Sequence, residues 1–203
     1  IFMQVTVIIA EDHSIVRLGL TSILNALDIS EVDAVSTCDA LKKQLQAKVY
    51  THLILDIILA DGNTIEIIEM INQNYPNMSV LIHSMQPFEV YGKIMNKLKV
   101  HSYLYKGASE SDIKKHLELF IKNMPLRSNN FFDDSTNPFS SLAVRELEIL
   151  HYLLNGYRTK EIASTLGLKM NTISTIKSNI FEKVKAESFP HLLQLAHVHQ
   201  ISY

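Results

Sequence analysis

Cysteine is nearly missing from this sequence: Cys38 is the single one in 203 residues, so no disulfide can form within the chain. A reducing, cytoplasmic location is therefore the simpler prediction. Long hydrophobic runs are missing too. The longest apolar stretch near the start, residues 5–10, is far shorter than the roughly 20 residues that span a bilayer, and no positively charged segment precedes it. We expect neither a membrane span nor a signal peptide.

Neither sign of charge dominates, because 19 Lys and Arg oppose 21 Asp and Glu. The balance is uneven along the chain, however. From Pro138 onward seven basic residues face five acidic ones, and the rest has twelve against sixteen. A mildly basic C-terminal part is a weak indication of a nucleic-acid-binding face. The sequence also shows no glycine-rich phosphate loop, zinc-ligand cluster or Ser-His-Asp arrangement, and we do not expect an enzyme.

Short apolar runs alternate with helical periods over the first two-thirds of the chain. The runs are rich in β-branched residues and do not alternate with polar ones, which suits strands buried on both faces of a parallel sheet. Between them apolar residues recur at helical spacing, and Ser109 with Asp112 forms a capping pair. Five strands alternating with five helices predict a doubly wound α/β fold, flavodoxin-like, over residues 3–122. The predicted strands are Val5–Ala10, Val32–Val35, Leu53–Leu55, Val80–Ile82 and Tyr103–Tyr105.

The pattern changes after this part. Residues 123–140 carry two prolines and four asparagines, a composition typical of a linker. Residues 141–203 read as helical throughout, and two short helices joined by a glycine-containing turn indicate a helix-turn-helix. The predicted helices are Leu142–Leu154, Arg158–Leu166, Lys169–Val184 and Ser188–Gln200.

Polar side chains follow the strands of the predicted sheet, at the edge where ligands of such folds bind. Glu11 and Asp12 follow the first strand, and Asp56 ends the third. Ser84 and Lys106 follow the fourth and fifth. Three carboxylates this close repel one another unless a cation lies among them. Mg²⁺ fits that role, because it prefers carboxylate oxygens and keeps waters open to a phosphate.

This layout resembles the receiver domain of NarL/FixJ-type two-component response regulators, most specifically over Val7–Leu20 with its acidic pair. The resemblance implies that Asp56 accepts a phosphoryl group from a partner histidine kinase. It also implies that Glu11, Asp12, Asp56 and the backbone carbonyl of Ile58 hold Mg²⁺. Lys106 would then pair with the phosphoryl oxygens, Ser84 would be the switch hydroxyl, and Tyr103 the switch aromatic.

Two departures from that family concern loops. The segment after Asp56 lacks the usual proline and its glycine, Gly62, arrives early. Lys99-Val100 replaces the usual Gly-Ala pair before the last strand. Both changes affect loop geometry more than the phosphorylation chemistry.

The C-terminal part resembles a LuxR-type DNA-binding domain over Leu142–Leu150, Gly156–Ala163 and Asn171–Ile180. Seven apolar residues form the expected core: Ile162, Ala163, Leu166, Leu168, Ile173, Ile176 and Ile180. The small hydroxyls on the opposite face allow a helix to enter the major groove, and a lysine there neutralises a phosphate. The resemblance implies DNA contacts by Lys160, Asn171, Thr172, Ser174, Thr175, Lys177 and Ser178. Because one such helix makes a small interface, we expect a homodimer on double-stranded DNA.

Two other functions compete with a phosphorylation-controlled transcription factor. One is a regulator that uses the receiver only for dimerisation, independently of phosphate. The other is a Mg²⁺-dependent phosphatase with an Asp nucleophile. Such enzymes carry a second Asp two residues further on as acid/base, and Ile58 occupies that position here.

Overall fold

The computed structural model describes residues 4–124 and 137–201. The chain divides into two compact units. The first contains the chain up to Met85 and resumes at Met95, and the second contains Gln86–Ile94 and the chain that follows the undescribed segment. Most of the predicted linker, 123–140, lies outside the described residues. The domain limits 3–122 and 141–203 stay predictions.

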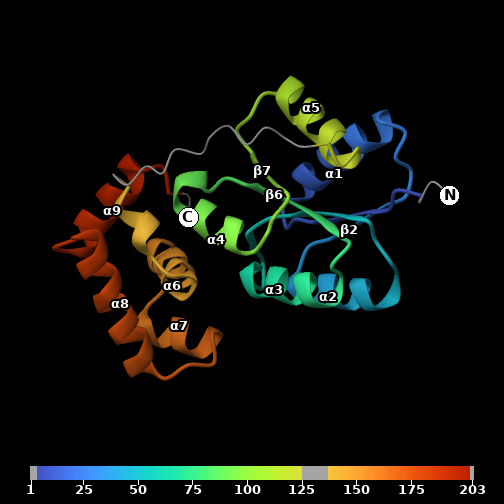
Figure 1. Ribbon diagram of the computed structural model, residues 1–203. Coiled ribbons are helices and arrows are strands. Elements are labelled where there is room, and N and C mark those ends of the chain that lie inside the picture. The colour runs from blue at the N-terminus through green and yellow to red at the C-terminus, as the bar shows by residue number, and fades with distance from the viewer. Residues whose placement is uncertain (1–3, 125–136, 202–203) are drawn as a thin grey trace. The chain divides into compact units, whose positions relative to one another are not determined.

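The first unit is built on a five-stranded parallel sheet with the strand order β2-β1-β3-β6-β7. This order confirms the predicted doubly wound fold. Helices α1 and α5 cover one face of the sheet, and α2 and α3 cover the other (Figure 1). The strands are β1 (Val7–Ala10), β2 (Val32–Val35), β3 (His52–Leu55), β6 (Ser79–Ser84) and β7 (Ser102–Tyr105). The helices of this unit are α1 (Ser14–Ala26), α2 (Cys38–Ala47), α3 (Ile65–Asn74) and α5 (Glu110–Ile121). Helix α4 (Phe88–Lys97) lies between β6 and β7 in the chain, and most of it falls in the segment Gln86–Ile94, which groups with the second unit.

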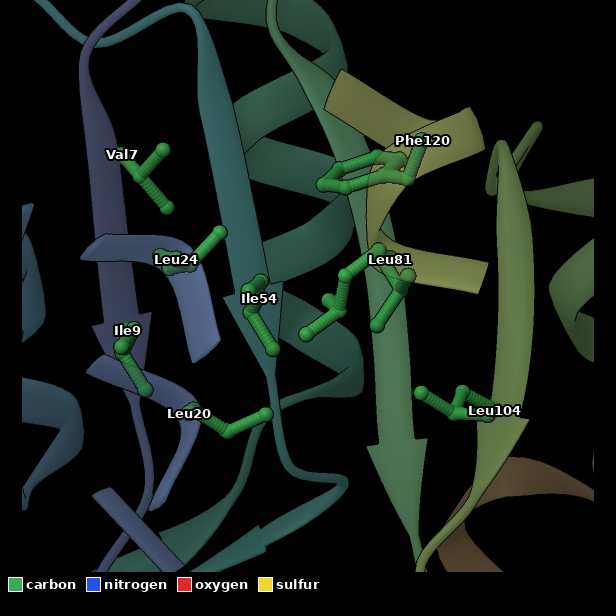
Figure 2. Packing of buried hydrophobic residues seen from close by; sticks show 9 residues of the cluster. Val7, Ile9, Leu20, Leu24, Ile54, Leu81, Leu104 and Phe120 are labelled. Carbon is green, nitrogen blue, oxygen red and sulfur yellow. The ribbon is translucent and has the colours of Figure 1, made fainter. Parts of the chain in front are cut away.

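Alternate residues of the strands fill the core between the sheet and helices α1 and α5 (Figure 2). Ile9, Ile54 and Leu81 come from three neighbouring strands, and Leu24 and Phe120 from the two helices. Burial of one such side chain contributes about 1.5–3 kcal/mol. These core residues lie within the strands, before their carboxyl ends. Their packing therefore holds the strand ends, and the residues that follow them, in place. The predicted capping pair also forms at the start of α5, where the Ser109 hydroxyl oxygen accepts from the Asp112 backbone N–H at 3.2 Å.

Several strand ends differ from the prediction by one or two residues, and Ser84 ends β6 instead of following it. Two further features differ from the sequence prediction. Strand β2 is not buried on both faces: Ala34 is exposed and its neighbours half-buried, because β2 is an edge strand. A small antiparallel hairpin, β4 (Ile58–Leu59) and β5 (Gly62–Asn63), was not predicted. Its turn residue Asp61 accepts hydrogen bonds from the backbone N–H groups of Cys38 at 2.6 Å and Asp39 at 3.1 Å. The loop after Asp56 is therefore fastened to the start of α2.

The second unit is helical. Helix α8 packs against η1, α6 and α7. Of the seven predicted core residues, four are buried, whereas Leu166, Leu168 and Ile176 are half-buried. The described helices follow the predicted order, with ends that differ by one or two residues. They are α6 (Val144–Leu154), α7 (Thr159–Thr165), α8 (Met170–Val184) and α9 (Phe189–Val198). The 3₁₀ helix η1 (Pro138–Ser141) was not predicted: its first three residues fall in the predicted linker, and the buried side chain of Phe139 ties it to the helical core.

Helices α6 and α7 begin without a capping side chain at Ala143 and Arg158. A glutamate three residues further on compensates in each case. Glu146 accepts from the Ala143 backbone N–H at 2.7 Å, and Glu161 from that of Arg158 at 2.6 Å. One half of a capping box therefore satisfies a donor at each helix start. No helix among the described residues is long and apolar enough to cross a membrane.

Candidate functional site

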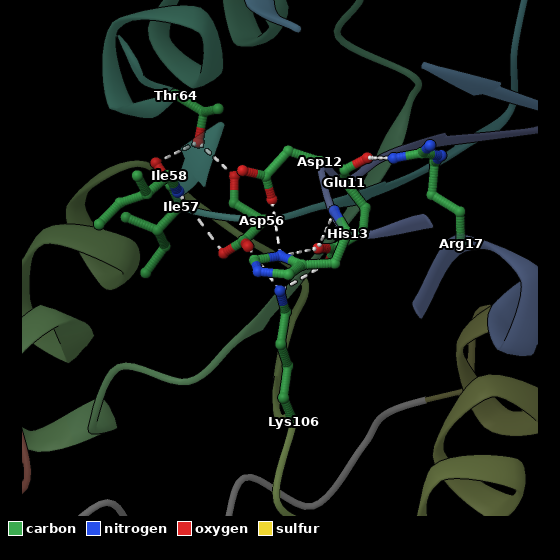
Figure 3. A network of polar contacts seen from close by, with 9 residues as sticks. All are labelled: Glu11, Asp12, His13, Arg17, Asp56, Ile57, Ile58, Thr64 and Lys106. Atoms are coloured by element: carbon green, nitrogen blue, oxygen red, sulfur yellow. Dashed lines mark hydrogen bonds and ion pairs between the residues drawn. The ribbon is translucent and has the colours of Figure 1, made fainter. Parts of the chain in front are cut away.

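The polar residues that end the strands meet at one edge of the sheet (Figure 3). Glu11 follows β1, Asp56 follows β3 and Lys106 follows β7. Parallel strands place their carboxyl ends at the same edge. Backbone bonds set the spacing, because the Asp56 N–H donates to the Ala10 carbonyl at 2.9 Å and the Lys106 N–H to the Ser84 carbonyl at 2.9 Å. The structure thus brings the predicted carboxylates and the lysine together.

The Lys106 ammonium lies between two buried carboxylates. Its Nζ is 2.5 Å from Asp56 Oδ2 and 2.6 Å from Glu11 Oε2. All three side chains are less than a tenth exposed. One cation therefore contacts two acids that are shielded from water, and the two carboxylates together exceed its charge by one when both are ionised.

These contacts and the burial of the site set its titration behaviour. Burial raises the pKa of Asp56 above its ordinary value, Lys106 opposes this rise, and Glu11 adds to it. Burial alone would lower the pKa of Lys106, but the carboxylates of Asp56 and Glu11 raise it overall. The lysine therefore stays charged at neutral pH, where it is available to an incoming anion.

The donor set fits a divalent cation. Ligand atoms of Glu11, Asp12, His13 and Asp56 lie within 4.8 Å of one another. The carboxylate oxygens are ligands that suit Mg²⁺, and Asp12 is partly exposed, which leaves room for waters. The predicted ligand set of Glu11, Asp12, Asp56 and the Ile58 carbonyl stays a prediction.

His13, to which the sequence assigned no role, contacts two acids of this cluster. Its Nδ1 is 3.0 Å from Glu11 Oε1 and 2.8 Å from Asp12 Oδ1, although the ring is largely exposed. The His13 backbone N–H also donates to Glu11 Oε1 at 3.1 Å. Adjacency to Asp12 was the only sequence signal for this position, and it does not fix where the ring points.

Two residues that we did not single out from the sequence hold the backbone of the site. The Thr64 hydroxyl is buried and lies 2.7 Å from the Asp56 carbonyl and 3.1 Å from that of Ile57. Arg17 donates to the Glu11 carbonyl at 2.6 Å. Figure 3 shows these contacts on opposite sides of the cluster. Thr64 and Arg17 position the two acids without touching their carboxylates.

The two predicted switch residues lie on adjacent strands. Ser84 is the last residue of β6 and is buried beside the backbone of Lys106. Tyr103 is buried in β7, opposite Ile82. Their roles in a switch stay predictions.

The predicted DNA contacts gather on helix α8, with Lys160 on α7. Ser174, Thr175 and Ser178 are exposed, whereas Ile173 and Ile180 on the opposite side are fully buried. The first turn of α8 carries no acidic residue. Asn171, Thr172 and Lys160 are also exposed. Residues 170–178 of α8 carry no acidic side chain, which is compatible with a phosphate backbone there.

Local contacts already engage several of these side chains. Thr175 donates to the Asn171 carbonyl at 3.0 Å, and Ser178 to the Ser174 carbonyl at 3.1 Å. The Lys177 ammonium lies 5.7 Å from the centroid of the Phe181 ring, a cation–π contact. The hydroxyl oxygens keep their acceptor capacity, and the lysine is only half-buried. The face is thus preorganised but still accessible.

Two family models match this chain. Residues 7–118 match the response regulator receiver domain, and residues 140–196 match the bacterial regulatory proteins of the luxR family. Each match covers one of the two candidate sites, the acidic cluster and the polar face of α8.

Relatives match over almost the whole chain. The oxygen regulatory protein NreC of Staphylococcus aureus (strain JH9) is 30% identical, over 94% of this chain and 95% of the relative. The response regulator protein VraR of Staphylococcus saprophyticus is 27% identical, over 98% and 99%. RcsB from Salmonella enterica serovar Typhimurium, solved on the promoter rprA with the phosphomimetic BeF3⁻, superposes with a TM-score of 0.76. It is 25% identical, over 95% of this chain and 98% of that one.

Proposed function

Because the chain belongs to the two-component response regulators that join a receiver domain to a LuxR-type DNA-binding domain, we propose that phosphorylation of Asp56 controls its dimerisation and DNA binding. A partner histidine kinase would be the phosphodonor. The observation that carries the proposal is the contact of Lys106 with both Asp56 and Glu11 at the edge of the sheet.

The chemistry assigns a role to each group. A carboxylate oxygen of Asp56 attacks the phosphorus of the donor, and the bond from phosphorus to the donor nitrogen breaks. Lys106 exchanges its contact with Asp56 for the transferred phosphoryl oxygens, whose charge it neutralises. Bound at Glu11, Asp12, Asp56 and the Ile58 carbonyl, Mg²⁺ would supply further neutralising charge.

The response follows from the added charge at Asp56. The Ser84 hydroxyl then bonds a phosphoryl oxygen, and Tyr103 fills the space that the hydroxyl vacates. A local charge change biases a two-state element in this way. Both side chains are buried before phosphorylation, so a rearrangement here also repacks the neighbouring surface.

The competing functions differ in measurable ways. A phosphate-independent regulator would bind DNA equally well with and without a phosphoryl mimic. A phosphatase would turn over an aryl phosphate. Position 58, where such an enzyme needs an acid/base, carries an isoleucine, so we expect no turnover.

We expect phosphorylation to convert the monomer to a dimer and thereby tighten DNA binding. One helix-turn-helix makes a small interface, and two half-sites are the usual remedy. The last helix contributes apolar area, since Leu193 and Leu195 of α9 are only half-buried. Sedimentation of the full chain with and without BeF3⁻ and Mg²⁺ measures the change. An unchanged monomer in both states would count against the proposal.

On DNA we expect Lys177→Ala and Thr175→Ala to differ in kind. Loss of a phosphate contact at Lys177 weakens all sequences alike and lowers the salt slope by about one unit per domain. Loss of a base contact at Thr175 costs roughly 1–3 kcal/mol on the preferred site and little elsewhere. A salt titration of each variant on a selected and a scrambled duplex separates the two effects.

Lys185→Ala is the matched control, because Lys185 is exposed beyond the C-terminal end of α8. This variant should change neither the salt slope of DNA binding nor the preference for the selected duplex over the scrambled one. If Lys177→Ala keeps the wild-type salt slope, or Thr175→Ala weakens both duplexes equally, the division of roles on α8 is wrong.

A further inference from the structure

Helix α8 begins with a large apolar side chain in water. Met170 is its first residue and is 51% exposed. Among the described residues of the second unit, the other large apolar side chains exposed to a similar degree, Tyr157 and Val198, lie outside α8. A single exposed apolar side chain is common on protein surfaces. The position of Met170 is what matters, because it begins the helix that we propose enters the major groove.

The common structural role for an apolar residue near a helix start is already taken. A hydrophobic staple joins the residue before the N-cap to the fourth helical residue. Lys169 is the N-cap, so these positions are Leu168, which is half-buried, and Ile173, which is fully buried. Met170 lies outside this pair.

Met170 shares a face with the predicted DNA contacts. Residues four apart in a helix lie one above the other, so Met170, Ser174 and Ser178 form one row. Lys177, seven residues on, flanks the same row. The Ser178 hydroxyl folds back onto the helix, bonding the Ser174 carbonyl at 3.1 Å. Met170 is therefore the longest apolar group on this row. It lies at the N-terminal end of α8, and the N-terminal residues of a recognition helix are those that contact base edges.

We propose that Met170 reads the 5-methyl group of a pyrimidine in the major groove. The inference rests on the proposed DNA-binding function of α8 and adds a base-recognition element to it. An apolar side chain discriminates thymine because its methyl is the one apolar feature among the base edges of the groove. Methionine suits this contact, since its flexible thioether adapts its shape to a small apolar partner. The same methyl occurs on thymine and on 5-methylcytosine.

The test removes the methyl and the side chain separately. A preferred duplex is selected with the full chain in the presence of BeF3⁻ and Mg²⁺, and each thymine is replaced in turn by uracil. We expect a loss of roughly fourfold in wild-type affinity at one thymine of a half-site, the equivalent of one buried methyl group. Met170→Ala should bind the thymine and uracil duplexes equally there. Met170→Leu should retain part of the discrimination.

Met124→Ala is the matched control, because Met124 is also 51% exposed but lies in the first unit, just beyond α5. It should discriminate as the wild type does. A second arm methylates each cytosine of the duplex. If methylation raises the affinity of the wild type but not that of Met170→Ala, the methyl group that Met170 contacts belongs to 5-methylcytosine, and the proposal is supported.

Two results would overturn the inference, and they are distinguishable. If the wild type selects a sequence but Met170→Ala responds to every methyl as the wild type does, Met170 reads no methyl group. If the wild type selects no sequence at all, the proposed DNA-binding function fails, and the inference fails with it.

Discussion

Asp56→Asn is expected to abolish phosphorylation of this protein. The wild-type chain, incubated with a small phosphodonor and Mg²⁺, should gain one phosphoryl group by intact-mass spectrometry, and the variant none. The reason is that Asp56 follows β3, the central strand of the sheet, and has the Lys106 ammonium 2.5 Å away, ready for the phosphoryl oxygens. An amide cannot form the acyl phosphate.

Loss of label in this variant should not reflect unfolding. Asparagine has nearly the volume of aspartate, and Lys106 keeps the Glu11 carboxylate at 2.6 Å as its counter-ion, so no unpaired charge is left buried. The control is Asp39→Asn, an exposed residue in the first turn of α2, which should be labelled as the wild type is. Equal labelling of Asp56→Asn and the wild type would place the acceptor elsewhere.

The second large effect is expected for Lys106→Met in the absence of metal. This variant keeps most of the apolar stem but removes the cation that contacts Glu11 and Asp56. Both carboxylates are more than nine-tenths buried, so they cannot recover the lost charge from water. Removal of one partner from a buried ionic cluster costs about 3–5 kcal/mol. The free energy of unfolding by urea, measured in a chelating buffer, should fall by that amount.

Added Mg²⁺ should restore stability to Lys106→Met more than it stabilises the wild type. A bound cation stabilises only the folded state, and it binds more tightly when no ammonium competes for the same oxygens. The control is Lys122→Ala, whose pair with Glu118 is exposed to solvent and should contribute little to stability. If Lys106→Met is as stable as the wild type without metal, or Mg²⁺ stabilises the two proteins equally, this electrostatic account is wrong.

The sequence by itself determined the two-part organisation and the order of the elements. Runs such as Val7–Ala10 and the helical spacing of α5 are local patterns, and local patterns fix local structure. The positions of Glu11, Asp56 and Lys106 after their strands followed from the same runs. Parallel strands end at one edge, so these residues had to come close together whatever the details of packing.

Only the tertiary structure decided which groups touch. The sequence placed Lys106 at the edge but could not show that it bridges Glu11 and Asp56, because that depends on how β1, β3 and β7 register. The exposure of β2 depends on its place at the edge of the sheet, which its composition does not reveal. The β4–β5 hairpin is stabilised by Asp61, whose partners lie more than twenty residues away in the chain. Contacts of this kind form only when distant segments of the chain pack together, and no local pattern in the sequence specifies them.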